Sequence, residues 1–417
     1  MKFIIQGGNK LKGEISVMGA KNAALKMIAA SVLFNGEVVL NNVPDILDIR
    51  NLQNILEKNG AVFLRSGNQL KIDTSKLTNH DPDPVLVEKM RGSIVLIGPY
   101  LARFGQIGLP QPGGCAIGCR PIDIHLHVFK EFGVDIKKEE NNFYQFKVEK
   151  LKAGKISFDK ISVTATENAI LAAVLTEGET EISNAACEPE ITDLIKFLNR
   201  AGAKIDGEGT NNLKITGVEK LNKIEYTVMP DKIEAATFIT LGLMTDSQIT
   251  VNGLRIEDIQ IFLDKLTEIG ASFESGENFV KIKNTQNLKA FEIETAVYPG
   301  FATDWQALMG LIATKTEGQS KINETIFENR LGYLKELQNM GANIEILNKH
   351  EALVNGPTSL KGAQIESLDL RAGATLVIAG LAANGKTIIE EAQIVDRGYE
   401  KIEERLQKLG AQITREL

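Results

Sequence analysis

The chain has 417 residues, of which 43% are hydrophobic and 24% are charged, a composition typical of a globular protein with two or three domains. The formal net charge of −7 argues against a broad basic surface for nucleic acid or anionic lipid. Three cysteines are too few for a disulfide framework, and the four histidines lack the spacing of a zinc site. No apolar run approaches the length of a membrane span. We therefore expect a cytoplasmic protein without a metal or another cofactor.

The first 18 residues have the pattern of strands and could pair with either half of the chain. A strongly apolar helix follows, and similar helices are predicted along the whole chain, at residues 22–33, 93–104, 167–175, 233–244, 304–313 and 372–383. Because these helices have almost no polar face, we expect other elements to surround them.

An amphipathic helix that ends at a glycine follows each apolar helix, and a strand with alternating apolar positions comes next. Glycine takes the left-handed conformation of a helix C-terminus at the lowest cost, and the glycines are Gly60, Gly133, Gly202, Gly270, Gly341 and Gly410. One such glycine would mean little, but six in register indicate six repeats. The midpoint near Pro230 predicts two domains of three repeats, 19–229 and 1–18 plus 230–417.

Charged residues lie at or just before the starts of the apolar helices: Lys21, Arg91, Lys232, Asp304 and Arg371. A cation beside the positive end of a helix is unfavourable unless an anion shares the site, which favours a phosphorylated ligand. Alternatively, the cations reach solvent or pair with carboxylates, and Asp304 is an ordinary N-cap.

A loop rich in glycine and proline carries Cys115, which is flanked by Gly113 and Gly114. The small neighbours disfavour burial, and Arg120 could stabilise the thiolate or hold an anion beside it, so this cysteine is a candidate reactive thiol. A small buried hydrophobe is the alternative, which we favour for Cys187, while the role of Cys119 stays open.

Two further motifs have simple structural interpretations. His125 and His127 alternate in IDIHLHV, which we interpret as a strand, and we assign neither a catalytic role. Asp396 precedes an amphipathic helix and could be its N-cap, with Arg397 in solvent.

The segments that carry a family resemblance are GAKNAALK from Gly19, MRGSI from Met90, PGGCAIGCRPIDIH from Pro112, DKISV from Asp159, EPEI from Glu188, TDWQA from Thr303, FENR from Phe327, DLRA from Asp369 and DRGYEKIE from Asp396. Nearly end to end, the chain resembles the UDP-N-acetylglucosamine 1-carboxyvinyltransferases, enolpyruvyl transferases that begin bacterial peptidoglycan synthesis. The resemblance implies an α/β fold, a two-domain inside-out α/β barrel of six βαβαββ-type repeats. It also implies transfer of the enolpyruvyl group of phosphoenolpyruvate to the sugar's 3-hydroxyl.

The resemblance also implies roles for single residues. Phosphoenolpyruvate or its phosphate would be bound by Lys21, Asn22, Cys115, Arg120 and Arg397. The UDP-sugar would be bound by Arg91, Arg120, Pro121, Ile122, Asp123, Ile124, Lys160, Ser162, Val163, Asp304 and Ile326. Asp304 would accept the hydroxyl proton, and Cys115, the family's fosfomycin target, would protonate the methylene carbon. The reaction would be an addition and elimination through a tetrahedral phospho-ketal, with Lys21, Arg120 and Arg397 stabilising the developing charge.

One departure from the family pattern is Thr164, which stands where many members have glycine. Two alternative functions fit the same architecture less well. The sister enzyme 3-phosphoshikimate 1-carboxyvinyltransferase shares the architecture, but the cysteine loop and the RPID stretch speak against it. A noncatalytic ligand-binding scaffold is disfavoured because Lys21, Cys115, Asp304 and Arg397 are all present.

Overall fold

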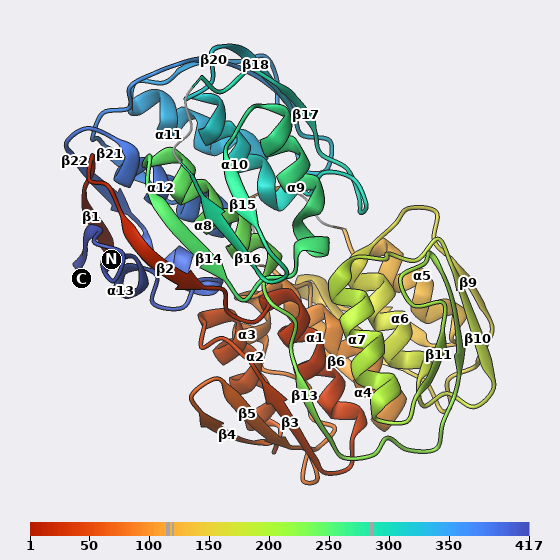
Figure 1. Cartoon of the computed structure of the whole chain (residues 1–417). Helices are drawn as coiled ribbons and strands as arrows, with labels where there is room; N and C mark the ends of the chain where they lie inside the picture. The colour runs from red at the N-terminus through yellow and green to blue at the C-terminus, as the bar shows by residue number, and fades with distance from the viewer. Residues whose placement is uncertain (114–116, 119–120, 284–286, 417) are drawn as a thin grey trace. The chain divides into compact units, whose positions relative to one another are not determined.

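The computed structural model describes residues 1–113, 117–118, 121–283 and 287–416, so Cys115, Cys119 and Arg120 lie outside the described residues. The chain divides into two compact units (Figure 1). As far as these ranges are described, unit 1 takes Met1–Met18, Ala116–Cys119 and Pro230–Leu417, and unit 2 takes Gly19–Cys115 and Arg120–Met229. Each unit has a hydrophobic core of its own.

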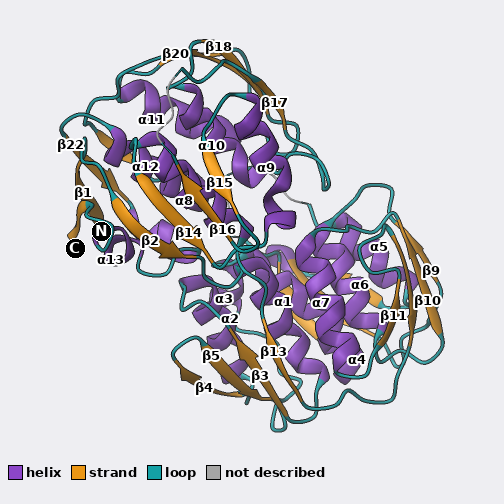
Figure 2. Ribbon diagram, in the orientation of Figure 1, coloured by secondary structure: helices purple, strands orange, loops and turns teal. Residues whose placement is uncertain are grey.

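The six predicted apolar helices are present, and they form the middle of each unit. They are α1 (Lys21–Ala30), α4 (Ile97–Phe104) and α6 (Val163–Ala173) in unit 2, and α8 (Lys232–Met244), α10 (Thr303–Ala313) and α12 (Leu370–Ala382) in unit 1. Every residue of α8 is buried, charged ones included. Figure 2 shows the sheets (orange) at the outside of each unit and helices (purple) within, which confirms the inside-out arrangement.

The predicted amphipathic helices are also present: α2 (Leu47–Lys58), α5 (Asp123–Glu131), α7 (Pro189–Arg200), α9 (Ile256–Glu268), α11 (Tyr333–Asn339) and α13 (Ile402–Gln407). The six glycines that follow them have φ between +81° and +102°, so the prediction of left-handed helix ends is confirmed. Short 3₁₀ helices complete the helical set: η1 (Ser31–Leu33), η2 (Arg91–Leu96), η3 (Glu140–Asn142), η4 (Arg330–Gly332) and η5 (Ala392–Arg397).

The strands of the described residues form six small sheets, three in each unit. In unit 2 the orders are β13 (Ile224–Thr227), β3 (Glu37–Asn41), β5 (Gln69–Asp73), β4 (Val62–Ser66); β6 (Gln106–Pro110), β8 (Phe143–Lys147), β7 (Asp135–Lys138); and β11 (Lys204–Asp206), β12 (Asn212–Thr216), β10 (Glu179–Ser183), β9 (Lys155–Ser157). In unit 1 they are β15 (Phe273–Ser275), β16 (Phe279–Ile282), β14 (Gln248–Asn252), β2 (Lys12–Ser16); β17 (Glu292–Glu294), β18 (Gly318–Asn323), β20 (Glu351–Gly356), β19 (Asn343–Ile346); and β21 (Gln364–Glu366), β22 (Lys386–Glu390), β1 (Lys2–Gln6), β23 (Gln412–Glu416).

Strands distant in sequence complete several of these sheets. β13 pairs in parallel with β3, so the end of unit 2 supplies the first strand of its first repeat. β2 pairs in parallel with β14, and β1 lies antiparallel between β22 and β23. The strands of residues 1–18 therefore pair with strands of unit 1.

The second repeat of unit 2 departs from the βαβαββ pattern, because its sheet has three strands and no parallel first strand among the described residues. The segment that precedes its apolar helix contains Pro82 and Pro84 and forms the short helix α3 (Pro84–Glu88). Proline cannot donate to a strand ladder, and Asp83 caps α3 by accepting from the Val85 backbone at 2.9 Å. The Asp81 carboxylate then accepts the backbone N–H of Gly108 in β6 at 2.6 Å, in place of a neighbouring strand. Among the described residues, no helix is long and apolar enough to cross a membrane.

Candidate active site

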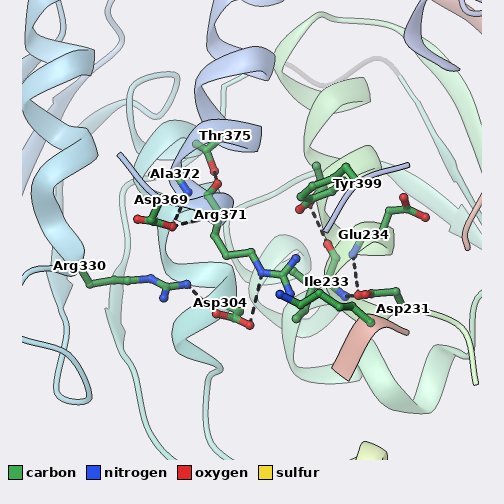
Figure 3. A network of polar contacts seen from close by, with 12 residues as sticks. Asp231, Ile233, Glu234, Asp304, Arg330, Asp369, Arg371, Ala372, Thr375 and Tyr399 are labelled. Carbon is green, nitrogen blue, oxygen red and sulfur yellow. Dashed lines mark hydrogen bonds and ion pairs between the residues drawn. The ribbon is translucent and has the colours of Figure 1, made fainter. Parts of the chain in front are cut away.

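In unit 1, Asp304 lies between two arginines at the start of α10. Arg330 Nη2 donates to Asp304 Oδ1 at 2.6 Å, and Arg371 Nε lies 3.5 Å from Asp304 Oδ2. Figure 3 shows the two guanidinium groups approaching the carboxylate from opposite sides. The Asp304 side chain keeps 27% of its exposure, whereas those of Arg330 and Arg371 keep 4% and 6%. Asp304 is thus open to a ligand, and its two cations are not open to solvent.

The charges of both arginines depend on nearby carboxylates. Burial disfavours the charged form of Arg330, but Asp304 and Asp369 outweigh this, and the pKa of Arg330 is raised. Burial also disfavours the charged form of Arg371, but the nearby negative groups, Asp304 first among them, outweigh the effect of burial, so the pKa of Arg371 is raised as well. Nη1 of Arg371 is buried without a hydrogen-bond partner among the described residues. Since buried donors normally find a partner, this donor marks a place, within the described part of the chain, where a ligand can supply the acceptor.

Asp304 is not the N-cap of α10, since Ala302 occupies that position and no side chain caps the helix. The N-cap of α12 is Asp369, which accepts from the backbones of Arg371 at 2.8 Å and Ala372 at 3.1 Å. The predicted conflict between cations and helix starts is therefore relieved in part by carboxylates here, as the alternative interpretation held.

Arg397 is the last residue of η5, which packs against the start of α12. A Cβ at Gly398 would lie 2.7 Å from Leu370 Cδ2, so glycine allows this close approach. Tyr399 then lies under Arg371, with the guanidinium carbon 5.9 Å from the ring centroid. These contacts bring the segment that carries Arg397 beside the Asp304 cluster.

Glu324 organises the segment around Ile326. Its carboxylate accepts from the backbones of Ile326 at 2.9 Å and Phe327 at 3.1 Å, and from the Thr303 hydroxyl at 2.8 Å. Thr303 directly precedes Asp304, so one buried carboxylate fixes both neighbourhoods. Ile326 itself is 37% exposed.

In unit 2, Lys21 is the first residue of α1 and pairs with Asp48 of α2, at 3.1 Å from Nζ to Oδ2. Both residues are buried. Asn22 follows Lys21 in the first turn of α1. Gly92 packs against Leu25, since a Cβ there would lie 3.4 Å from Leu25 Cδ1, so α1 and the segment of Arg91 are neighbours.

The predicted UDP-sugar residues of unit 2 gather around the starts of α5 and α6. Arg91 donates from Nη1 to the Pro112 carbonyl and from Nη2 to the Pro121 carbonyl, both at 3.3 Å. Ser162 caps α6 by accepting from the Ala165 backbone at 3.4 Å. Pro121, Asp123 and Lys160 are exposed, Ile124, Ser162 and Val163 are half-buried, and Ile122 is buried.

A buried chain of hydrogen bonds joins these two stretches. His125 Nε2 lies 3.1 Å from Thr164 Oγ1, and His125 Nδ1 lies 3.1 Å from Asn168 Nδ2. Because an amide nitrogen can only donate, the ring proton sits on Nε2 and points to Thr164. Burial, with Arg91 and Lys26 nearby, lowers the pKa of His125 to about 3, which keeps it neutral.

Two predictions disagreed at IDIHLHV. The strand predicted from the alternation is wrong, and the amphipathic helix predicted before Gly133 is confirmed, because Asp123–Glu131 form helix α5. In a helix, residues two apart face different sides, so His125 is buried and His127 is exposed. Short apolar alternation does not separate the two structures.

The chain matches a known protein family over almost its whole length. The family model described as EPSP synthase (3-phosphoshikimate 1-carboxyvinyltransferase) matches residues 5–406.

The chain belongs to the enolpyruvyl transferase family. It is 42% identical over 414 residues to a UDP-N-acetylglucosamine 1-carboxyvinyltransferase of Desulfosudis oleivorans, and 43% identical over 416 residues to one of Psychromonas ingrahamii. In both cases 99% of each chain is covered. The enolpyruvyl transferase NikO from Streptomyces tendae has a similar structure, with a TM-score of 0.91, 26% identity and coverage of 99% of this chain and 98% of that chain. An EPSP synthase of Acinetobacter baumannii shares the fold at a TM-score of 0.76 and 18% identity, with 100% of each chain covered.

Sequence reasoning missed three residues of this enolpyruvyl transferase that touch or fix the predicted site: Arg330, Asp48 and Glu324. Arg330 lies in the FENR segment that contributed to the resemblance, but no helix start or spacing marked it as a partner of Asp304. The carboxylates Asp48 and Glu324 had no signal in the sequence at all, because only the fold brings them to Lys21 and Thr303. Cys115 and Arg120 remain predictions, since both lie outside the described residues.

Proposed function

We propose that this protein transfers the enolpyruvyl group of phosphoenolpyruvate to the 3-hydroxyl of UDP-N-acetylglucosamine and releases phosphate. The observation that carries the proposal is the match over 99% of the chain, at 42–43% identity, to relatives that bear this activity in their names. EPSP synthases match at only 18% identity, which speaks for the nucleotide sugar over shikimate 3-phosphate as the acceptor. The step would belong to peptidoglycan synthesis, and we place it in the cytoplasm.

Asp304 is the proposed general base for the 3-hydroxyl. The guanidinium groups at 2.6 and 3.5 Å favour its ionised form, which is the form that can accept a proton. Its partial exposure leaves room for a hydroxyl donor, and the buried arginines hold the carboxylate in one orientation. As the oxygen bonds to C2 of the enolpyruvyl group, the hydroxyl proton passes to Asp304.

Phosphoenolpyruvate carries charge on both its carboxylate and its phosphate, so its site needs several cations. We assign Lys21, Asn22, Arg120 and Arg397 to it. Nη1 of Arg371, buried with no hydrogen-bond partner in the described part of the chain, supports an anion beside Asp304. Asp48 supports the role of Lys21 by fixing its position. The same cations would stabilise the phospho-ketal and the departing phosphate.

Cys115 is the proposed general acid that protonates C3 as the sugar oxygen attacks C2. In the elimination, C3 loses a proton to the Cys115 thiolate, the C2–C3 double bond re-forms, and the phosphate leaves with the proton that Asp304 accepted. Since both protons and the phosphate are accounted for, no cofactor is needed for this sequence of steps.

The UDP-sugar contacts are proposed for Arg91, Arg120, Lys160 and Asp304, for the stretches Pro121–Ile124 and Ser162–Val163, and for Ile326. Two contacts support the grouping. The bond to the Pro121 carbonyl holds Arg91 beside the 121–124 stretch, and the contact of His125 with Thr164 holds that stretch beside residues 162–163.

Phosphate release tests the proposal when the purified protein receives phosphoenolpyruvate with one acceptor at a time. We expect release with UDP-N-acetylglucosamine and none with shikimate 3-phosphate. Release with shikimate 3-phosphate alone would show that the protein is a 3-phosphoshikimate 1-carboxyvinyltransferase. Release with neither acceptor would support a noncatalytic scaffold.

A further inference from the structure

Arg415, on the strand β23, is bound to two carboxylates at once. Nη1 and Nη2 donate to Asp396 Oδ2 and Oδ1, both at 2.7 Å. Nε donates to Glu403 Oε1 at 2.7 Å, and Nη2 also donates to Glu403 Oε2 at 3.0 Å. Both donor edges of the planar guanidinium are therefore filled, which is the geometry that makes arginine pairs strong and directional.

The surroundings hold this arrangement in place. The guanidinium carbon of Arg415 lies 4.7 Å from the ring centroid of Phe3, so β1 covers one face of the group. The side chain of Arg415 keeps 19% of its exposure, and that of Glu403 keeps 16%. Burial disfavours the charged form of Arg415, but Asp396 and Glu403 outweigh it, and the pKa of Arg415 is raised.

The contact with Asp396 links Arg415 to the proposed substrate site, because Asp396 directly precedes Arg397 in η5. Non-glycine residues in left-handed conformations flank the segment, Glu391 with φ +55° and Lys401 with φ +43°. Such conformations cost free energy and persist only where surrounding contacts hold them. The Arg415 network binds one carboxylate on each side of Arg397 in the sequence and so ties this segment to β23.

We propose that Arg415 is a positioning residue for Arg397, because it holds the Asp396 carboxylate and keeps that negative charge from opposing an anionic substrate. The proposal rests on the proposed function, in which Arg397 binds phosphoenolpyruvate. Without Arg415, two carboxylates lose their cation beside Arg397. Asp396 can then pair with Arg397 or repel the substrate, and either effect weakens phosphoenolpyruvate binding while leaving the nucleotide sugar unaffected.

Three variants test the proposal: Arg415→Met, Asp396→Asn and the double variant. We expect Arg415→Met to raise the KM for phosphoenolpyruvate about tenfold, the effect of one charge a few ångströms away, with the KM for UDP-N-acetylglucosamine within about twofold. Asp396→Asn should change either KM by less than about threefold, because the opposing charge is gone. For the same reason, the double variant should regain most of the lost affinity. Arg50→Met is the matched control. Arg50 also donates two hydrogen bonds of 2.7 Å to one carboxylate, that of Asp45 in unit 2, and its replacement should change neither KM.

A merely structural role for Arg415 predicts the opposite pattern, in which Asp396→Asn is as harmful as Arg415→Met and the double variant is no better. That pattern, or an unchanged KM for phosphoenolpyruvate in Arg415→Met, would overturn the proposal. If Arg415→Met does not fold, Arg415→Lys is tested in its place, because lysine keeps the positive charge but cannot donate two parallel hydrogen bonds to one carboxylate. This variant should raise the KM for phosphoenolpyruvate about threefold. No rise would overturn the proposal. Turnover by the wild type tests the proposed function separately, and calorimetric titration with phosphoenolpyruvate replaces KM if turnover is absent.

Discussion

Lys26 of α1 and Glu167 of α6 form an ion pair inside unit 2, with 3.2 Å between Nζ and Oε2. The side chains keep only 7% and 1% of their exposure. Burial, with Glu188 and Glu190 nearby, raises the pKa of Glu167 from 4.5 to about 7, although Lys26 opposes the rise. Because α1 begins with Lys21 and α6 begins just after Ser162, this pair joins two helices that carry proposed substrate contacts.

A carboxyl whose pKa is raised by folding binds its proton more tightly in the folded state than in the unfolded one. Its contribution to stability is therefore full below pH 4.5 and is lost as the pH rises to about 7, which amounts to about 3 kcal/mol. Lys26→Met removes the cation that favours ionisation and raises this pKa further. In that variant the loss continues above pH 7, at about 1.4 kcal/mol per pH unit.

The double variant Lys26→Met/Glu167→Gln is the reference, because nothing titrates there. Differential scanning calorimetry from pH 4.5 to 9 should show the wild type losing about 3 kcal/mol relative to this reference, with Lys26→Met losing more at high pH. The sole tryptophan, Trp305, is buried in unit 1, so its fluorescence transition is an internal control that should not move among the variants. Parallel pH dependence in the wild type and the double variant would show that Glu167 does not titrate in this range.

Other substitutions address the chemistry and the repeats. Asp304→Asn should lower kcat by about 10²–10⁴-fold, the usual contribution of a general base, with the melting temperature monitored beside the rate; retained kcat would remove Asp304 from the mechanism. Cys115→Ala should lose most activity and Cys119→Ala should keep it in the same phosphate assay, and equal losses would mean that the acid is misassigned. Gly270→Ala should cost about 1 kcal/mol because φ is +88°, whereas Gly154→Ala, with equally open space and no positive φ, should be nearly neutral in thermal unfolding.

The repeated helices could be predicted because their signals are local. Apolar helices without a polar face must be enclosed by other elements. A glycine after an amphipathic helix ends that helix through its own left-handed backbone conformation, without any distant contact. Prediction failed where a contact overrode the pattern, as at α3, where prolines and the Asp83 cap replaced an expected strand. It failed again in α5, where seven residues were too few to distinguish a helix from a strand.

The site was predictable only in part for a similar reason. The family resemblance selected Asp304 and Arg397, which lie in recognisable segments. The arginines that pair with Asp304 and with Asp396, the neighbour of Arg397, are Arg330 and Arg415. They come from other elements of the fold and show no pattern of their own. The charge around Asp304 is therefore a property of the fold and not of any one segment.

The identity of the product tests the central claim most directly. The purified protein is incubated with phosphoenolpyruvate and UDP-N-acetylglucosamine, and the sugar product is examined by NMR while phosphate is measured. We predict an enolpyruvyl ether on the 3-oxygen of the sugar, formed in equal amount to the released phosphate. Phosphate released without this ether, or an enolpyruvyl group carried by shikimate 3-phosphate and not by the nucleotide sugar, would contradict the account.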